Sequence, residues 1–213
     1  MTIQHHIDDA TLMAYATGSL PEAFNLIVAT HVSLCDTCRA TVESFDAVGG
    51  AVMDSAQIAT LSADSLDRAL ARLDVPADMP VLSAPRGGTL PGPLIDYIGG
   101  DLENVRWRPV GLGVKQAILP TSSEASARLL FIPAGTAIPD HSHNGREMTM
   151  VLQGALLDDH ERFARGDVEI ADDHVHHQPM ADIGEDCICL AVTDAPLRFK
   201  GLIPRIVQKF VRI

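Results

Sequence analysis

Basic side chains, aromatic side chains and long apolar runs are all scarce in this chain of 213 residues. Lys and Arg number 16 against 28 Asp and Glu, which gives a formal net charge of −12 at pH 7. Such a chain is a poor ligand for nucleic acid, because the phosphate backbone selects Lys and Arg, and it suits an anionic membrane surface equally badly. We therefore expect neither a nucleic acid nor a membrane as its direct partner.

The apolar runs are strand-sized, far shorter than the roughly 20 residues that cross a bilayer. The first residues lack the basic and apolar segments of a secretory signal. We therefore expect a cytoplasmic protein, in which thiols stay reduced. Under those conditions the four cysteines favour metal ligands, buried apolar groups or redox-active thiols over structural disulfides; they are Cys35, Cys38, Cys187 and Cys189.

Residues 1–73 hold only three aromatic residues and show helical apolar spacing. We expect four short helices there: one capped by Asp8 or Asp9 and ending near Gly18, one opened by a capping box at Ser19 and Glu22, one over 36–53, and one from Ser62. The core of such a segment is thin, and small domains of this kind usually need a staple.

Proline and glycine then mark a boundary. Residues 74–93 contain five prolines and a Gly-Gly pair, which predicts a linker or an extended surface segment. After Pro93 the apolar period changes to about two, and the runs favour an antiparallel sandwich or barrel; they span Val105–Leu119, Ala127–Ile132, Met148–Leu152, Val168–Ile170 and Cys187–Thr193. We predict a multi-domain chain, with an all-α domain over 1–85, the rest of the linker over 86–93, an all-β domain over 94–195, and a C-terminal extension over 196–213.

A first metal motif lies in the helical part. His31, Cys35 and Cys38 follow His-x3-Cys-x2-Cys spacing, which lets one imidazole and two thiols converge across a tight helix–helix connection. A tetrahedral structural zinc needs a fourth N or S donor, and the other histidines before the linker are His5 and His6, of which we favour His6. Zinc would supply the missing staple. The alternative is an exposed redox pair of cysteines beside incidental histidines.

This segment resembles the zinc-binding anti-sigma domain, whose motif is an early His followed by His-x3-Cys-x2-Cys; the matching residues are His6, His31, Cys35 and Cys38. The resemblance covers about the first 75 residues. It implies a structural zinc and helices that bind a sigma factor and mask the surfaces that the factor needs for core RNA polymerase. Residues 1–85 carry 3 basic and 11 acidic side chains, a net −8 that suits a basic protein partner.

A second metal motif lies in the β part. His141 and His143 are two residues apart, so on a strand they project from one face, and Glu147 can return a carboxylate after the Asn144-Gly145 turn. Two imidazoles and a carboxylate suit Zn, Fe, Mn, Ni or Cu. The alternatives are ligand types retained without metal and a surface cluster of histidines.

The run from Gly135 to Gly154 resembles the first cupin motif at every defined position. Aligned on Gly166, the second cupin motif keeps its histidine as His177 but loses its turn Pro and Gly and its final Asn, and His174 or His176 could substitute. The resemblance covers about residues 90–195. It implies a small jelly-roll barrel that holds a second divalent metal, which we expect to be zinc, on His141, His143, Glu147 and His177.

Cys187 and Cys189 alternate on one apolar strand, and we expect a packing role for both. A sensory thiol near the metal is the alternative.

A zinc anti-sigma domain joined to a cupin resembles the ChrR group of anti-sigma factors. That resemblance implies a regulator without enzymatic activity that sequesters an extracytoplasmic-function sigma factor of the Sigma-E type. It also implies a cupin that is needed for release under singlet-oxygen or related oxidative stress. The competing class is a metal-dependent cupin enzyme, a dioxygenase or isomerase, with a regulatory zinc domain. A DNA-binding repressor is disfavoured because the chain is acidic and lacks a basic recognition helix.

Overall fold

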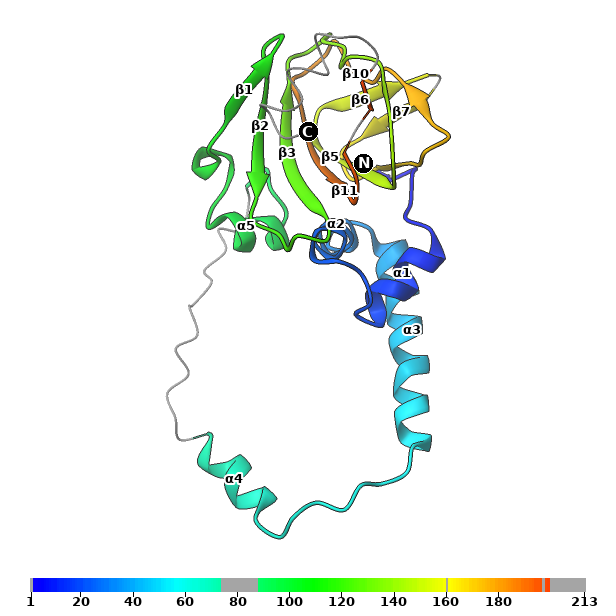
Figure 1. The fold of residues 1–213 in the computed structure, drawn as a ribbon, viewed down its shortest axis with the longest axis vertical. Helices are drawn as coiled ribbons and strands as arrows, with labels where there is room; N and C mark the ends of the chain where they lie inside the picture. Colours follow the sequence, from blue (N-terminus) through cyan, green and yellow to red (C-terminus); the bar gives the residue numbers. More distant parts are fainter. Residues whose placement is uncertain (1, 74–87, 160, 197, 200–213) are drawn as a thin grey trace.

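The structure is a computed structural model that describes residues 2–73, 88–159, 161–196 and 198–199 (Figure 1). Its first part is helical, as the apolar spacing predicts. The helices are α1 (Asp9–Ala16), α2 (Glu22–Val32), α3 (Asp36–Ser55) and α4 (Ser65–Ala71). Asp8 caps α1 by accepting a hydrogen bond from the Thr11 amide at 2.9 Å, which confirms the predicted start of the first helix.

The predicted capping box at the start of α2 is wrong. The residue at the N-cap is Pro21, whose side chain makes no capping hydrogen bond. Ser19 instead donates to the Ala14 carbonyl at the end of α1, at 3.1 Å. The Glu22 carboxylate turns away from its own helix and accepts hydrogen bonds from Tyr97 Oη and the Ser122 amide, both at 2.6 Å. Contacts with the second half of the chain therefore override the local capping pattern.

A fifth helix, α5 (Gly92–Ile98), begins inside the predicted linker and is followed by the short 3-10 helix η1 (Leu102–Asn104). The composition hides α5, because Pro91 and Pro93 suggest a linker although proline is compatible with a first helical turn. Leu90, just before it, is buried. The predicted linker over 86–93 is thus folded from residue 88 on, and residues 74–87 lie outside the described part of the chain.

The second part consists of antiparallel sheets, and the predicted β-like runs are confirmed as strands or, for Val105–Leu119, as a hairpin. The main sheet has the order β1 (Arg108–Gly111), β2 (Val114–Leu119), β3 (Ser126–Ile132), β11 (Cys187–Thr193), β5 (Glu147–Gln153) and β8 (Val168–Ala171). Two three-stranded sheets complete the fold. One has the order β10 (Met180–Ala181), β6 (Ala155–Asp158), β7 (Glu161–Ala164), and the other β12 (Arg198–Phe199), β4 (His141–Ser142), β9 (His176–His177).

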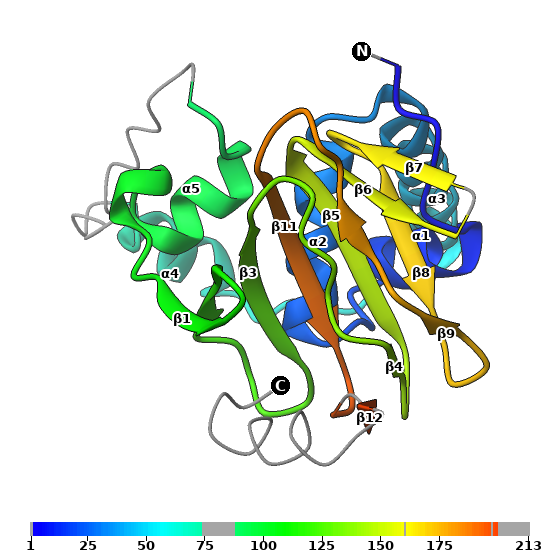
Figure 2. The same cartoon turned by 90° about the horizontal axis from the view of Figure 1, so that it is seen from above.

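Helix α2 lies across the outer face of the main sheet, behind β3, β11 and β5 (Figure 2). The central strand β11 is therefore buried on both faces. Its Ile188 and Leu190 belong to the same hydrophobic cluster as Ile27 of α2, whereas Cys187 and Cys189 face a second cluster on the other side. The predicted fold class, an all-α part followed by an all-β part, is confirmed. The two parts share one apolar cluster.

Helix α4 stands apart from both layers (Figure 1). None of its residues is buried, and its Leu66 and Leu70 side chains are exposed. Among the described residues, no helix has both the length and the apolar character required to cross a membrane.

Candidate metal centres

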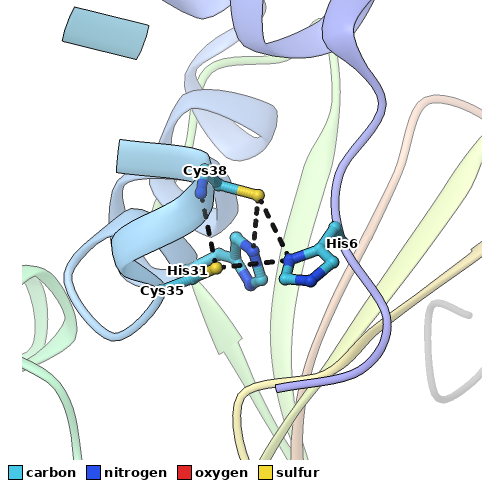
Figure 3. A group of neighbouring side chains, drawn as sticks. All are labelled: His6, His31, Cys35 and Cys38. Atoms are coloured by element: carbon cyan, nitrogen blue, oxygen red, sulfur yellow. Dashed lines mark hydrogen bonds between the residues drawn. The ribbon is translucent and has the colours of Figure 1, made fainter. Parts of the chain in front are cut away.

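Four donor side chains meet where the N-terminal segment crosses the connection between α2 and α3 (Figure 3). Nδ1 of His6 lies 3.3 Å from Sγ of Cys35 and 3.6 Å from Sγ of Cys38. Nε2 of His31 lies 3.3 Å from Sγ of Cys38. All four ligand atoms are within 4.8 Å of one another, and three of the residues are buried while His6 is exposed. We call these residues the four-donor cluster.

Local sequence builds most of this cluster. His31 lies in the last turn of α2, and Cys35 is the N-cap of α3, where its Sγ accepts from the Cys38 amide at 3.5 Å. Cys38 follows in the first turn of α3. Only His6 comes from a distant element.

The four-donor cluster fits zinc. In a tetrahedral zinc site with ordinary bond lengths, nitrogen and sulfur ligands are about 3.5 Å apart, which matches the separations observed here. Burial lowers the pKa of His31 and so favours the neutral imidazole that a metal binds. Burial also raises the pKa of Cys38 to about 11, so a metal must displace a proton from this thiol.

His5, the alternative fourth ligand, lies outside the cluster. Its ring contacts Phe163, with centroids 4.3 Å apart, and its Nδ1 is 3.4 Å from Oδ2 of Asp167. The structure therefore brings His6 rather than His5 to the cysteines.

Three imidazoles meet at a second point, within the β part of the chain. Nε2 of His177 lies 3.1 Å from Nε2 of His143 and 3.3 Å from Nε2 of His141. All three residues are buried, and together they form what we call the histidine cluster. His141 and His177 face each other as partners on β4 and β9. Of the alternatives to His177, His174 and His176 are both exposed.

The histidine cluster also fits a divalent metal. Nitrogen ligands of a tetrahedral zinc are about 3.3 Å apart, close to the observed separations. Neutral imidazoles that turn their Nε2 lone pairs toward one another repel unless a cation or a proton lies between them. On the far side of its ring, His141 donates from Nδ1 to the Pro139 carbonyl at 2.9 Å, so its Nε2 carries the lone pair that a metal would bind.

Two carboxylates behind His177 were not found from the sequence. Nδ1 of His177 lies 2.8 Å from Oδ2 of Asp158 and 3.1 Å from Oε1 of Glu169. Burial alone would lower the pKa of His177, but these two carboxylates raise it to about 9. A signal for Glu169 was available, since it is the one charged residue of the apolar strand β8.

Glu147 lies beside the histidine cluster, with Oε2 3.3 Å from Nδ1 of His143. Its Oε1 accepts a hydrogen bond from the Thr149 hydroxyl at 3.2 Å. Burial alone would raise the pKa of Glu147, but the His143 imidazole and the two further imidazoles of the cluster hold it below its usual value. The carboxylate is thus ionised next to the cluster and contacts the side of His143 that faces away from His177.

Cys187 and Cys189 are fully buried, with their sulfurs 3.4 Å apart and no disulfide between them. They pack with Val151 and Phe163. Their thiols lie in the apolar surroundings expected for a packing role.

Comparison with known proteins gives three consistent findings. Residues 97–196 match the family model described as the ChrR cupin-like domain. The chain is 55% identical over 213 residues, all of both chains, to the anti-sigma-E factor ChrR of Cereibacter sphaeroides. It also matches a chain of the crystal structure of Rhodobacter sphaeroides SigE in complex with the anti-sigma ChrR, with 54% identity, 91% coverage of this chain, complete coverage of that chain, and a TM-score of 0.81. The chain therefore belongs to the ChrR family of anti-sigma factors, and it is a regulatory protein rather than an enzyme.

Proposed function

We propose that the chain sequesters an extracytoplasmic-function sigma factor of the Sigma-E type through its helical segment and thereby blocks transcription initiation. The observation that carries this proposal is the full-length similarity to a ChrR that is named an anti-sigma-E factor. A similar chain is also described in complex with SigE. Such a partner acts on RNA polymerase, so the proposal implies a cytoplasmic protein.

The apolar surface of α3 and α4 supports the same proposal. The second half of α3, α4 and the segment between them expose large apolar side chains; they are Val48, Val52, Met53, Ile58, Leu61, Leu66, Leu70 and Leu73, each at least 51% exposed. Large apolar side chains exposed in such number within one segment favour a partner that covers them. The acidic side chains of residues 1–85 favour a basic partner.

A pull-down of the full chain with a Sigma-E-type sigma factor from the same cell tests this half of the proposal. We expect a stable complex that inhibits transcription in vitro. Val52→Glu combined with Leu70→Glu should weaken it by more than tenfold, because each places a charge in the apolar surface. Ile183→Glu is the matched control, since Ile183 is 81% exposed on the β part of the chain. No complex, or equal weakening by the control, contradicts the proposal.

We further propose a structural zinc on His6, His31, Cys35 and Cys38, and a second zinc in the cupin held by His141, His143 and His177 with Glu147 as the fourth residue of the site. A divalent metal in the cupin supplies a Lewis acid and an open coordination position to an incoming ligand. The chain's own residues fix the imidazoles and exclude water, since His141, His143 and His177 are 3%, 2% and 6% exposed.

The cupin, in this proposal, responds to singlet oxygen or related oxidative stress and triggers release of the sigma factor. The shared apolar cluster of α2 and the main sheet supports it, because a change in the barrel alters the surface on which α2 packs. Release requires that the changed state bind the sigma factor less tightly.

The sensing half is tested on the complex with a fluorescently labelled sigma factor, illuminated with a dye that generates singlet oxygen. We expect release from the wild-type chain, and an intact complex with His141→Ala under the same light. Release that is equal for both chains contradicts the sensing proposal and leaves sequestration untouched.

A further inference from the structure

The turn between β7 and β8 contacts the four-donor cluster directly. The Gly166 carbonyl accepts a hydrogen bond from Nδ1 of His31 at 2.9 Å. Because a carbonyl oxygen only accepts, Nδ1 carries the hydrogen and Nε2 keeps its lone pair toward Cys38. A backbone atom of the cupin thus sets the tautomer of a ligand that belongs to the helical segment.

Gly166 is required at this position. Its φ of +95° is a conformation that side chains disfavour, and an added Cβ would lie 2.6 Å from Cδ1 of Ile3. The N-terminal segment therefore packs against the bare backbone of the turn.

The neighbouring Asp167 holds that N-terminal segment in place. The side chain of Asp167 is buried, with only 2% of its surface exposed. Oδ1 accepts hydrogen bonds from the amides of Gln4 at 2.7 Å and His5 at 3.0 Å, while Oδ2 accepts from the Ala164 amide at 2.8 Å. The Val168 amide donates to the His5 carbonyl at 3.2 Å. Residues 4 and 5 thus bind along the edge of β8, next to the ligand His6.

The same strand reaches the histidine cluster two residues later. Glu169 of β8 places Oε1 3.1 Å from Nδ1 of His177. Among the described residues, β8 pairs with β5 alone in the main sheet, so its other edge is available to the N-terminal segment. Four consecutive residues, 166–169, therefore contact His31, the segment that carries His6, and His177.

We propose that Asp167 is a positioning residue that couples the two metal clusters through β8, so that a metal on His177 strengthens retention of the metal on His6 and His31. The coupling is reciprocal, because linkage between two binding sites has one free energy. A cupin that loses or rearranges its metal then loosens the segment that completes the four-donor cluster. This inference rests on the proposed metal sites and needs no sigma factor.

The test is a double-mutant cycle on the full chain loaded with zinc, with a chromophoric chelator to follow zinc release. The four chains are the wild type, His177→Ala, Asp167→Ala and the double variant. The His177→Ala chain loses the zinc-release phase of the histidine cluster, so the phase that remains in it is assigned to the four-donor cluster. We expect His177→Ala to speed that phase about tenfold, a typical size for coupling between sites. Asp167→Ala should speed it by a similar factor, and the double variant should be no faster than Asp167→Ala alone.

Asp101→Ala is the matched control. The Asp101 carboxylate also accepts three backbone hydrogen bonds, from Thr89 at 2.7 Å, Leu90 at 3.1 Å and Leu102 at 2.8 Å, and it contacts neither cluster. We expect it to leave both the release rate and its dependence on His177 unchanged. Additive effects of Asp167→Ala and His177→Ala, or a rate within twofold of wild type in Asp167→Ala, overturn the coupling.

Hydrogen exchange tests the coupling without altering Asp167, in case the alanine variant does not fold. We expect His177→Ala to speed exchange at the amides of Gln4, His5 and Val168, whereas equal exchange in the two chains overturns the proposal. A chain that binds no zinc at the four-donor cluster overturns the metal assignment together with the coupling. A chain that binds zinc without coupling overturns only the coupling.

Discussion

The four-donor cluster and the histidine cluster are built in opposite ways. Three ligands of the first come from eight consecutive residues at a helix–helix junction, in a segment with few aromatic residues. The ligands of the second come from separate strands, β4, β9 and the loop after β4, that are joined by sheet pairing. The first cluster therefore completes a weak core, whereas a strong apolar core positions the second.

This contrast predicts different consequences of losing each metal. Helix α1 buries only Thr11 and Leu12, and α3 buries only Cys38 and Val42, so few apolar contacts hold these helices. The β strands next to the histidine cluster have fully buried side chains such as Met150 and Leu190. We infer a structural role for the first metal and a signalling role for the second.

The largest expected effect is that of Cys35→Ala. Structural zinc contributes an apparent binding free energy of about 10 kcal/mol or more to folding, so its loss should unfold α1 and the start of α3. Circular dichroism should show less helix, and zinc analysis should give one metal per chain instead of two. Cys187→Ala is the control, since this buried cysteine lies outside both clusters. Full helicity in Cys35→Ala contradicts a structural role for the first metal.

His141→Ala should have a smaller structural effect. We expect it to lower the zinc content to one per chain while the far-ultraviolet spectrum keeps its wild-type shape, because the apolar clusters of the sheet remain. Thermal unfolding, followed by circular dichroism at wavelengths for helix and for β structure, measures the stability of each part. Collapse of the β signal at room temperature shows that the second metal is structural as well.

Local pattern explains how far each cluster is predictable from sequence. His31, Cys35 and Cys38 are identified by their spacing because they lie on one helix–turn–helix segment. His6 is predicted only because a tetrahedral zinc needs a fourth ligand. Its position beside the cysteines depends on the hydrogen bonds of Gln4 and His5 to Asp167, more than 160 residues away in the sequence.

Long-range contacts account for what the sequence did not reveal. Asp158 and Glu169 meet behind His177 because strands β6 and β8 run past the same point. Glu169 stands out as a charge in an apolar strand, but no local motif predicts its contact with His177. The packing of α2 on the main sheet is hidden for the same reason, and it explains why Glu22 leaves the predicted capping box for Tyr97 and Ser122. The positions of α1 to α3 and of the strands of the main sheet, by contrast, follow from apolar periodicity.

Glu147 determines whether the second metal site has four protein ligands, like the first, or three. In the structure its carboxylate contacts Nδ1 of His143, so we expect Glu147→Gln to weaken zinc binding about 10- to 100-fold, as loss of a partner behind a ligating histidine does. Competition with a chelator of known affinity measures the change, and Glu185→Gln, at an exposed residue, serves as the control. A loss of zinc affinity as large as that caused by His141→Ala would instead show that Glu147 is a direct ligand, the fourth of its site.

The smallest expected effect is measured over a single pH unit, and it separates the two clusters by the pKa values of their histidines. Burial lowers the pKa of His31, so its imidazole is already neutral at pH 7 and gives no proton to displace. The pKa of His177 is raised to about 9 in the metal-free chain by Glu169 and Asp158, against the effect of burial. Below pH 9 a metal must therefore displace a proton from Nε2 of His177, and affinity at the histidine cluster should rise as pH increases from about 6.5 to about 9, by up to about tenfold per unit.

Chelator competition at pH 7 and pH 8 measures this rise in the Cys35→Ala chain, where only the histidine cluster binds zinc, provided that its β signal is intact. Glu169→Gln removes one of the two carboxylates that stabilise the protonated imidazole, so it should flatten the rise over this interval. Glu161→Gln, on the exposed end of β7, is the matched control and should leave the slope unchanged. A slope that is the same in Glu169→Gln as in its parent shows that the proton is held by the three imidazoles alone, and the carboxylates then orient His177 without setting its affinity for protons.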